Sequence, residues 1–312
     1  MIRRMRVAFF GTPEFAAASL EALLASRHQV VAVVAQPDRP AGRGMKLHKP
    51  PVAVVAERER IPLLQPVKVR NEEFLSAFRS FGADIAAVVA YGRILPKHLL
   101  DAAPHGFLNV HGSILPKYRG AAPIQRAIES GETETGVSIM RLDEDLDHGP
   151  VYSIVRTPLG ADERAPELFA RLAEIGGHAL VSVLDAIESG AASAVEQDHA
   201  AASFAPKIEK EESDVVWKVP AKSVYDRFRA FDPWPGIRAT IAGEPVKLLD
   251  VRPVFEADGT PGEVVAVDRD SFVVACGAGG LRVLLAQRPG KPRVSGGDYA
   301  RGARLAAGAR LA

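Results

Sequence analysis

Four short, largely apolar segments in the first 111 residues, each typical of a buried strand, constrain the fold of this chain more than any other feature. They span residues 7–10, 30–35, 84–90 and 106–111, and stretches with helical periodicity separate them, at 14–25, 51–59 and 71–81. A strand that is apolar on both faces is typical of a parallel sheet covered by helices on each side. Strands that alternate with helices form βαβ units. We therefore predict an α/β domain with a doubly wound, mostly parallel, Rossmann-like sheet.

The sequence changes in character after residue 188. A helix at 122–130, a strand at 136–141 and a long helix at 167–188 complete the predicted first domain, residues 1–188. Residues 189–205 are rich in Ala, Ser and Gly, which is typical of a linker. Beyond them, one helix at 221–230 precedes short apolar runs that Gly, Pro and Asp turns separate. Such spacing predicts a small β-barrel as a second domain, residues 206–312.

The amino-acid composition excludes several classes of protein and of site. The chain has 39 Lys and Arg against 38 Asp and Glu, so its net charge of +1 argues against nonspecific coating of nucleic acid. No apolar stretch is long enough to span a membrane, and the run at 7–10 is too short for the core of a signal peptide. The single cysteine, Cys276, excludes an internal disulfide and a cysteine-based zinc site. We expect a cytoplasmic protein.

A polar motif begins at the end of the fourth predicted strand. Asn109 and His111 are two residues apart on the predicted strand, so their side chains project from the same face. Open α/β sheets bind their ligands at the carboxyl ends of the strands. An amide beside an imidazole supplies a donor for a developing oxyanion and a group that moves protons. The alternative is a pair that only closes a loop through hydrogen bonds.

The acidic segment 143–150 is a second candidate. It holds four carboxylates and one histidine, His148, and most such segments are solvated loops. Its spacing matches no specific pattern of metal ligands. One of these carboxylates, at the edge of the sheet beside a Gly-Pro pair, could instead orient the His111 imidazole.

The segment 36–49 carries four basic residues, Arg39, Arg43, Lys46 and Lys49, against one acid. Loops of this length are uncommon and often functional. Guanidinium and ammonium groups at this density suit a phosphate backbone, although a mobile surface loop is the simpler alternative. The first turn, at Gly11, lacks the glycines of a dinucleotide fingerprint or a phosphate-binding loop, so nothing here indicates a nicotinamide or ATP site.

Together these motifs resemble the folate-dependent formyltransferases. The resemblance rests on Asn109 and His111 with the segment 113–116, and on Asp147, which follows His111 by 36 residues. The segments 10–15 and 131–136 fit the same superfamily, while 38–44, 206–208 and 232–235 are similar to the branch that formylates methionyl-tRNA. This likeness covers almost the whole chain.

The resemblance implies transfer of a formyl group from 10-formyltetrahydrofolate to the amino group of methionyl initiator tRNA, in support of translation initiation. It implies a catalytic role for Asn109, His111 and Asp147 and an OB-like fold for the second domain, which would bind tRNA. The expected folate contacts are Ser113, Ile114, Leu115 and Pro116, and the expected tRNA contacts are Arg43, Lys46 and Lys49. We expect no metal ion, no membrane partner and a monomer.

Two other functions stay open from the sequence. A formyltransferase of the same superfamily that acts on an amino-sugar nucleotide can share the three catalytic residues and the C-terminal barrel, but it does not need a long basic loop. A non-catalytic module that binds RNA or nucleotides is the alternative of a different class, since a fold does not fix a function.

Overall fold

The computed structural model describes residues 4–41 and 46–311, which fall into two compact units. The first unit holds the described residues up to Pro123 together with Glu134–Pro158 and Leu168–Ala205. The second holds Ile124–Thr133, Leu159–Glu167 and the described part of 206–312. The segment 189–205, with the 3₁₀ turn η1 (His199–Ala201), therefore belongs to the first unit.

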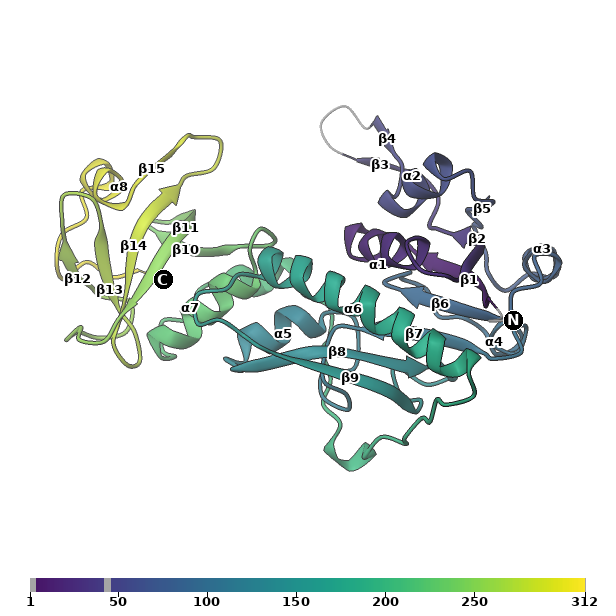
Figure 1. Ribbon diagram of the computed structural model, residues 1–312. Coiled ribbons are helices and arrows are strands. Elements are labelled where there is room, and N and C mark those ends of the chain that lie inside the picture. Colours follow the sequence, from purple (N-terminus) through teal and green to yellow (C-terminus); the bar gives the residue numbers. More distant parts are fainter. Residues whose placement is uncertain (1–3, 42–45, 312) are drawn as a thin grey trace. The chain divides into compact units, whose positions relative to one another are not determined.

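A seven-stranded sheet forms the centre of the first unit (Figure 1). In sheet order its strands are β5 (Leu63–Leu64), β2 (Gln29–Val34), β1 (Arg6–Gly11), β6 (Ile85–Val89), β7 (Phe107–His111), β8 (Glu134–Arg141) and β9 (Val151–Pro158). The first five strands are parallel, whereas β8 and β9 are antiparallel to their neighbours. The predicted doubly wound, mostly parallel sheet is confirmed.

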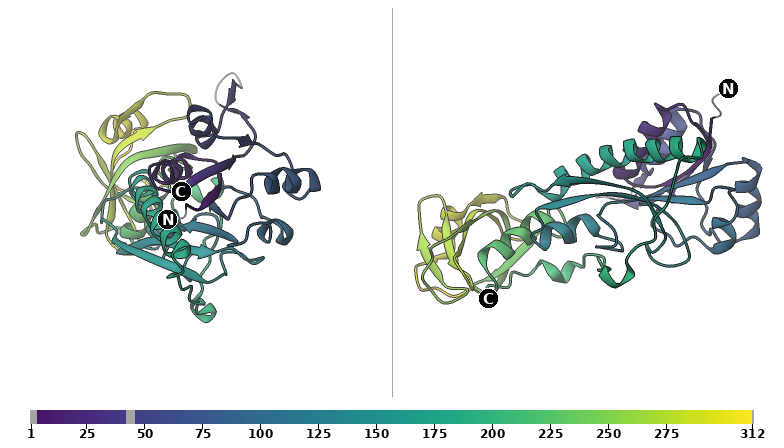
Figure 2. Two further views of the ribbon diagram at one scale, coloured as in Figure 1. Left: turned by 45° about the vertical axis from the view of Figure 1, so that its right-hand side comes forward. Right: turned by 60° about the horizontal axis from the view of Figure 1, so that its bottom comes forward.

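Helices cover both faces of this sheet (Figures 1 and 2). They are α1 (Glu14–Leu24), α2 (Pro51–Arg58), α3 (Glu72–Ser80), α4 (Lys97–Leu100) and α6 (Ala165–Glu188). On one face, Phe10 and Phe107 of the sheet pack against Phe74 and Phe78 of α3, with Phe10 ring centroids 5.4 to 6.4 Å from the other three. On the other face, α6 crosses β7 closely, since a Cβ on Gly176 would lie 2.7 Å from a methyl group of Val110. Because α3 and α6 bury β7 from opposite sides, the strand that carries Asn109 and His111 is held rigidly.

Several elements of the first unit escaped prediction. Most residues of the edge strand β9 are exposed or half-buried, so β9 lacks the continuous apolar run that is typical of a central strand. The basic segment 36–49 was expected to be an irregular loop, but it contains a two-stranded ribbon of β3 (Arg39–Ala41) and β4 (Lys46–His48). Strands of three residues are too short to leave a periodic pattern.

The second unit is built on an antiparallel sheet. Its strands are β10 (Ile237–Ile241), β11 (Glu244–Val254), β12 (Val264–Val267), β13 (Phe272–Ala275), β14 (Gly280–Gln287) and β15 (Arg293–Ser295), joined in the order β10-β11-β14-β13-β12 with β15 on β14. Helices α5 (Pro123–Glu129), α7 (Ala221–Ala230) and α8 (Gly296–Ala303) and the turn η2 (Lys210–Ser213) accompany it. The expected small β domain is confirmed, and its ladder is an open path from β10 to β12 in the described residues. The sequence did not predict the strands β10 and β15. It also did not predict the helix α8, which begins with two glycines.

Among the helices that the structure describes, none combines the length and the apolar character that crossing a membrane requires.

Candidate active site

The Asn109–His111 pair lies at the carboxyl end of β7, where the sheet changes from parallel to antiparallel. Asn109 faces Val88 of the parallel neighbour β6, and His111 faces Ser138 of the antiparallel neighbour β8. Asn109 is half-buried, while His111 is only 5% exposed. The predicted polar motif therefore stands at the sheet edge that α/β folds use for ligands.

Asp147 joins this pair from the loop between β8 and β9. Its Oδ1 accepts a hydrogen bond of 3.2 Å from Asn109 Nδ2, and its Oδ2 lies 3.6 Å from His111 Nδ1. Oδ2 also accepts a 2.8 Å hydrogen bond from the backbone N–H of Gly120. Three side chains that are up to 38 positions apart in sequence thus form one cluster, and the carboxylate is its centre.

A backbone constraint explains the glycine that supports Asp147. Gly120 has φ +124°, and a Cβ at this position would come within 2.7 Å of the Ala205 carbonyl oxygen. The chain therefore passes close to the segment 189–205 here, and only glycine fits without displacing it. Gly120 is present in the sequence, but only the tertiary structure shows that it passes close to Ala205 and binds the Asp147 carboxylate.

Both ring nitrogens of His111 face acceptors. Nε2 lies 2.9 Å from the carbonyl oxygen of Tyr118, and Nδ1 faces the Asp147 carboxylate. Because a carbonyl oxygen only accepts, Nε2 carries the proton in the neutral ring. A proton on Nδ1 would point at the Asp147 carboxylate, whose Oδ2 lies 3.6 Å away.

The four residues expected to contact folate differ in accessibility. Ser113 is fully buried, and its hydroxyl donates to the Lys117 carbonyl oxygen at 2.6 Å. Leu115 packs with Met140 and Val151 in a small core cluster, whereas Ile114 and Pro116 are half-buried. The Ser113 hydroxyl is thus engaged in the fold of the loop.

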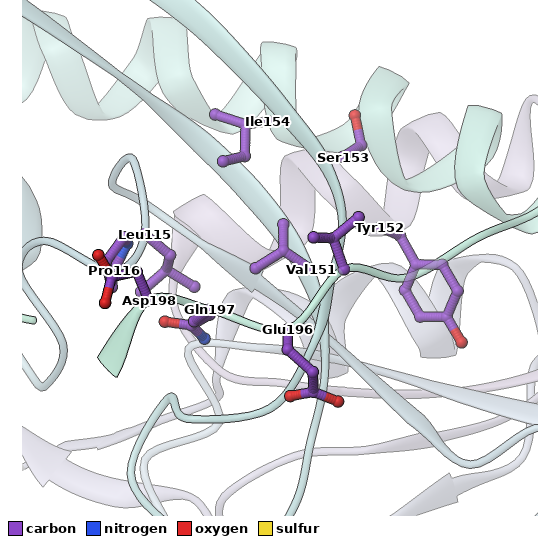
Figure 3. Close-up of a pocket in the computed structure, with 10 residues that line it drawn as sticks. Leu115, Pro116, Val151, Tyr152, Ser153, Ile154, Glu196, Gln197 and Asp198 are labelled. Carbon is purple, nitrogen blue, oxygen red and sulfur yellow. The ribbon is translucent and has the colours of Figure 1, made fainter. Parts of the chain in front are cut away.

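A pocket of about 310 Å³ opens beside Leu115 and Pro116. Its lining continues through residues 151–154 of β9 and residues 195–198 of the following segment. Figure 3 shows the Gln197 amide beside Leu115 and Pro116, with the Tyr152 ring turned away from them. Two of the four expected folate residues, Leu115 and Pro116, therefore line this cavity together with Gln197.

The three expected tRNA contacts are only partly described. Lys49 is exposed, and its Nζ lies 2.6 and 2.7 Å from the two carboxylate oxygens of Glu57, which raises the pKa of the ammonium group. Arg43 and the side chain of Lys46 lie outside the described residues. An exposed ion pair of this kind is weak, so the Lys49 ammonium group can release Glu57 and bind another anion instead.

The histidine of the acidic loop, His148, contacts a second histidine, His199, which lies in η1 of the segment 189–205. His148 Nδ1 lies 2.7 Å from Asp143 Oδ2, and the His148 ring stacks on His199 with centroids 4.0 Å apart. Within residues 4–41 and 46–311, no three His, Cys, Asp or Glu side chains are grouped in a way that could hold a metal ion.

Comparison with known proteins defines the family. The formyl transferase family model matches residues 5–184, and the model of the formyl transferase C-terminal domain matches residues 207–304. The chain belongs to the formyl transferase family. It is 48% identical over 304 residues to the methionyl-tRNA formyltransferase of Anaeromyxobacter dehalogenans, covering 96% of this chain and 97% of the relative. An enzyme of that name from Thermus thermophilus is 48% identical over 307 residues, covering 98% of this chain and 99% of the relative.

Solved structures share the fold at low sequence identity. HypX from Aquifex aeolicus in complex with tetrahydrofolic acid superposes with a TM-score of 0.63 at 19% identity, over 98% of this chain and 48% of HypX, so this chain spans about half of that protein. An N-formyltransferase from Helicobacter canadensis, in complex with folinic acid and dTDP-3-aminofucose, gives a TM-score of 0.67 at 17% identity over 90% and 98%. These likenesses concern the fold alone.

Proposed function

We propose that this chain transfers a formyl group from 10-formyltetrahydrofolate to the amino group of methionyl initiator tRNA and so supports translation initiation. The observation that carries the proposal is the 48% identity, over nearly the whole of both chains, to relatives named methionyl-tRNA formyltransferase. The cluster of Asn109, His111 and Asp147 supports it, because amide, imidazole and carboxylate are the groups that acyl transfer to an amine requires.

The proposed chemistry begins with attack of the neutral amine of the methionyl group on the formyl carbon. Negative charge then develops on the formyl oxygen, and a positioned donor lowers the energy of that state. An amide NH₂ group carries two hydrogens, and Asn109 gives one of them to Asp147. The second hydrogen of Asn109 is the donor that we assign to the oxyanion, and a protonated His111 adds positive charge beside it.

Collapse of the tetrahedral species requires a proton to move from the attacking nitrogen to the departing folate nitrogen. Asp147 is the acceptor in the cluster, and His111 Nδ1 lies 3.6 Å from its Oδ2. We assign to this pair the relay of that proton, through water, so that the attacking amine becomes the formylated amide and the departing folate nitrogen receives the proton. No covalent intermediate with the protein is needed.

The remaining assignments belong to the same proposal. Residues 1–188 would carry the chemistry, 189–205 would link the domains, and 206–312 would bind tRNA. Ser113, Ile114, Leu115 and Pro116 would border the folate, while Arg43, Lys46 and Lys49 would contact the tRNA phosphates. We further propose that the protein is cytoplasmic, acts as a monomer and needs no metal ion.

A direct assay tests the function. The purified chain, 10-formyltetrahydrofolate and methionyl initiator tRNA should yield formylmethionyl-tRNA, detected by acid gel electrophoresis or by mass spectrometry of the released amino acid. A parallel reaction contains a dTDP-amino sugar in place of the tRNA. Formylation of the sugar without formylation of the tRNA would contradict the proposal.

A further inference from the structure

We infer that Gln197 is a positioning residue for the formyl transfer, because it holds the backbone of the loop that carries Asp147. This inference rests on the proposed function, since it concerns the placement of the Asp147 carboxylate. Gln197 lies in the segment 189–205, outside the sheet and far in sequence from the three catalytic candidates. It is nevertheless 7% exposed, which is unusual for an amide side chain.

The Gln197 amide nitrogen clamps the catalytic loop on both sides of residue 148. Nε2 donates to the carbonyl oxygen of Asp147 at 3.0 Å and to that of Gly149 at 2.7 Å. Both hydrogens of the amide are therefore used on backbone acceptors of the same loop. Two bonds from one planar group fix the orientation of this stretch of backbone as well as its position.

The conformation of Asp147 explains why the loop needs such a clamp. Its φ of +46° lies in the left-handed region, which is sterically disfavoured for a residue with a Cβ. Residues in this region persist when surrounding contacts hold them there. The left-handed turn is also what directs the carboxylate towards Asn109 and Gly120, so a relaxed backbone would withdraw it from both.

Arg119 determines which way the Gln197 amide faces. The Arg119 guanidinium donates to Gln197 Oε1 from Nε at 3.2 Å and from Nη2 at 2.8 Å. Because a guanidinium has only donors, Oε1 must point to it and Nε2 must point to the loop. Arg119 also precedes Gly120, whose N–H binds the Asp147 carboxylate, so one support system holds the backbone and the side chain of Asp147.

Three substitutions separate positioning from simple loss of packing. In Gln197→Glu, the carboxylate keeps the contact with Arg119 but has no donor for the two carbonyl oxygens. Gln197→Met keeps the volume of the side chain and loses every hydrogen bond, and it serves if the Glu variant does not fold. Gln29→Glu is the control, since it makes the same change at an exposed position. Gln29 is the first residue of β2, so it lies at the amino end of that strand.

Steady-state kinetics with 10-formyltetrahydrofolate and methionyl-tRNA give the first readout. We expect Gln197→Glu to lower kcat by about a hundredfold with little change in either KM, as for loss of a group that acts in the transition state. In an Asp147→Asn background the same substitution should cost less than about threefold, because Gln197 acts through Asp147. An equal loss in both backgrounds would overturn the inference.

Hydrogen exchange of the Gly120 amide gives a readout that does not depend on turnover. In the wild-type chain this N–H is bound to Asp147 Oδ2, so it should exchange at least about tenfold more slowly than in Gln197→Glu or Gln197→Met. Unchanged protection in both variants would show that Asp147 stays in place without Gln197. A wild-type chain that transfers no formyl group would refute the proposed function, whereas the Gly120 exchange would still decide the role of Gln197.

Discussion

Replacement of Asp147 by Asn removes one negative charge from the centre of the cluster while nearly preserving its shape. The carboxylate accepts from Asn109 Nδ2 at Oδ1 and from the Gly120 N–H at Oδ2, whereas an asparagine has one acceptor oxygen and one donor group. Whichever way the new amide is turned, one of these two donors faces another donor. The substitution also leaves His111 without its opposite charge.

The size of the effect follows from the distance between His111 and Asp147. Their Nδ1 and Oδ2 atoms are 3.6 Å apart, and Asp147 is only 8% exposed. Unit charges at about 4 Å attract each other by about 4 kcal/mol at the effective dielectric of about 20 that suits protein sites. If the imidazolium forms in the transition state, losing that attraction lowers kcat by about a thousandfold, since each 1.36 kcal/mol is roughly a factor of ten.

Single-turnover transfer from 10-formyltetrahydrofolate to methionyl-tRNA, with enzyme in excess, measures this loss without interference from product release. Asp145→Asn is the matched control, because it removes the same charge from an exposed position in the same loop. We expect the control to retain its rate within about twofold, as an exposed charge contributes little. A rate constant for Asp147→Asn within about tenfold of wild type would refute the assignment of Asp147 as the partner of His111.

Three further predictions concern tRNA, stability and the thiol. Arg43→Ala should raise KM for methionyl-tRNA but not for the folate, and should reduce the slope of log(kcat/KM) against log salt by about one. Asp226→Ala should lower the free energy of unfolding by about 3 to 5 kcal/mol in urea titrations. The reason is that Arg229, which is 1% exposed and 2.5 Å from Asp226, loses the carboxylate that balances its buried charge. Burial raises the pKa of the Cys276 thiol to about 11, so a disulfide reagent at pH 8 should modify it only after denaturation.

The sheet of the first unit could be predicted because its central strands are buried on both faces. Runs such as Ile85–Val89 are apolar at every position, so no choice of register changes which residues enter the core. The edge strand β9 is mostly exposed or half-buried without a regular alternation, and such a pattern is shared with many loops. The side chains described in the ribbon of β3 and β4, those of residues 39–40 and 47–48, are exposed, so no buried pattern marks these strands in the sequence.

The candidate catalytic side chains were visible in the sequence for a local reason. Asn109 and His111 share one strand, and the period of a strand places them on one face. The acidic segment 143–150 was a candidate source of a carboxylate for His111, but the choice of Asp147 within it came only from the family resemblance. Gln197 left no signal, because a short polar stretch such as residues 196–199 within an Ala- and Ser-rich segment is typical of a solvated linker. Its two contacts with the Asp147 loop span 48 and 50 positions, a separation at which spacing carries no information.

The hydrogen bonds of Asn109 and His111 suggest different roles for the two side chains. The sequence indicated an amide donor for the oxyanion beside an imidazole that moves protons, and in the structure His111 contacts the Tyr118 carbonyl oxygen through Nε2 and faces Asp147 through Nδ1. A direct hydrogen bond from His111 to a substrate oxygen would require it to release one of these acceptors. Asn109 has no such conflict, since its NH₂ group keeps one hydrogen after the bond to Asp147. We therefore propose that Asn109 donates directly to the oxyanion, while His111 and Asp147 supply charge and a route for the proton.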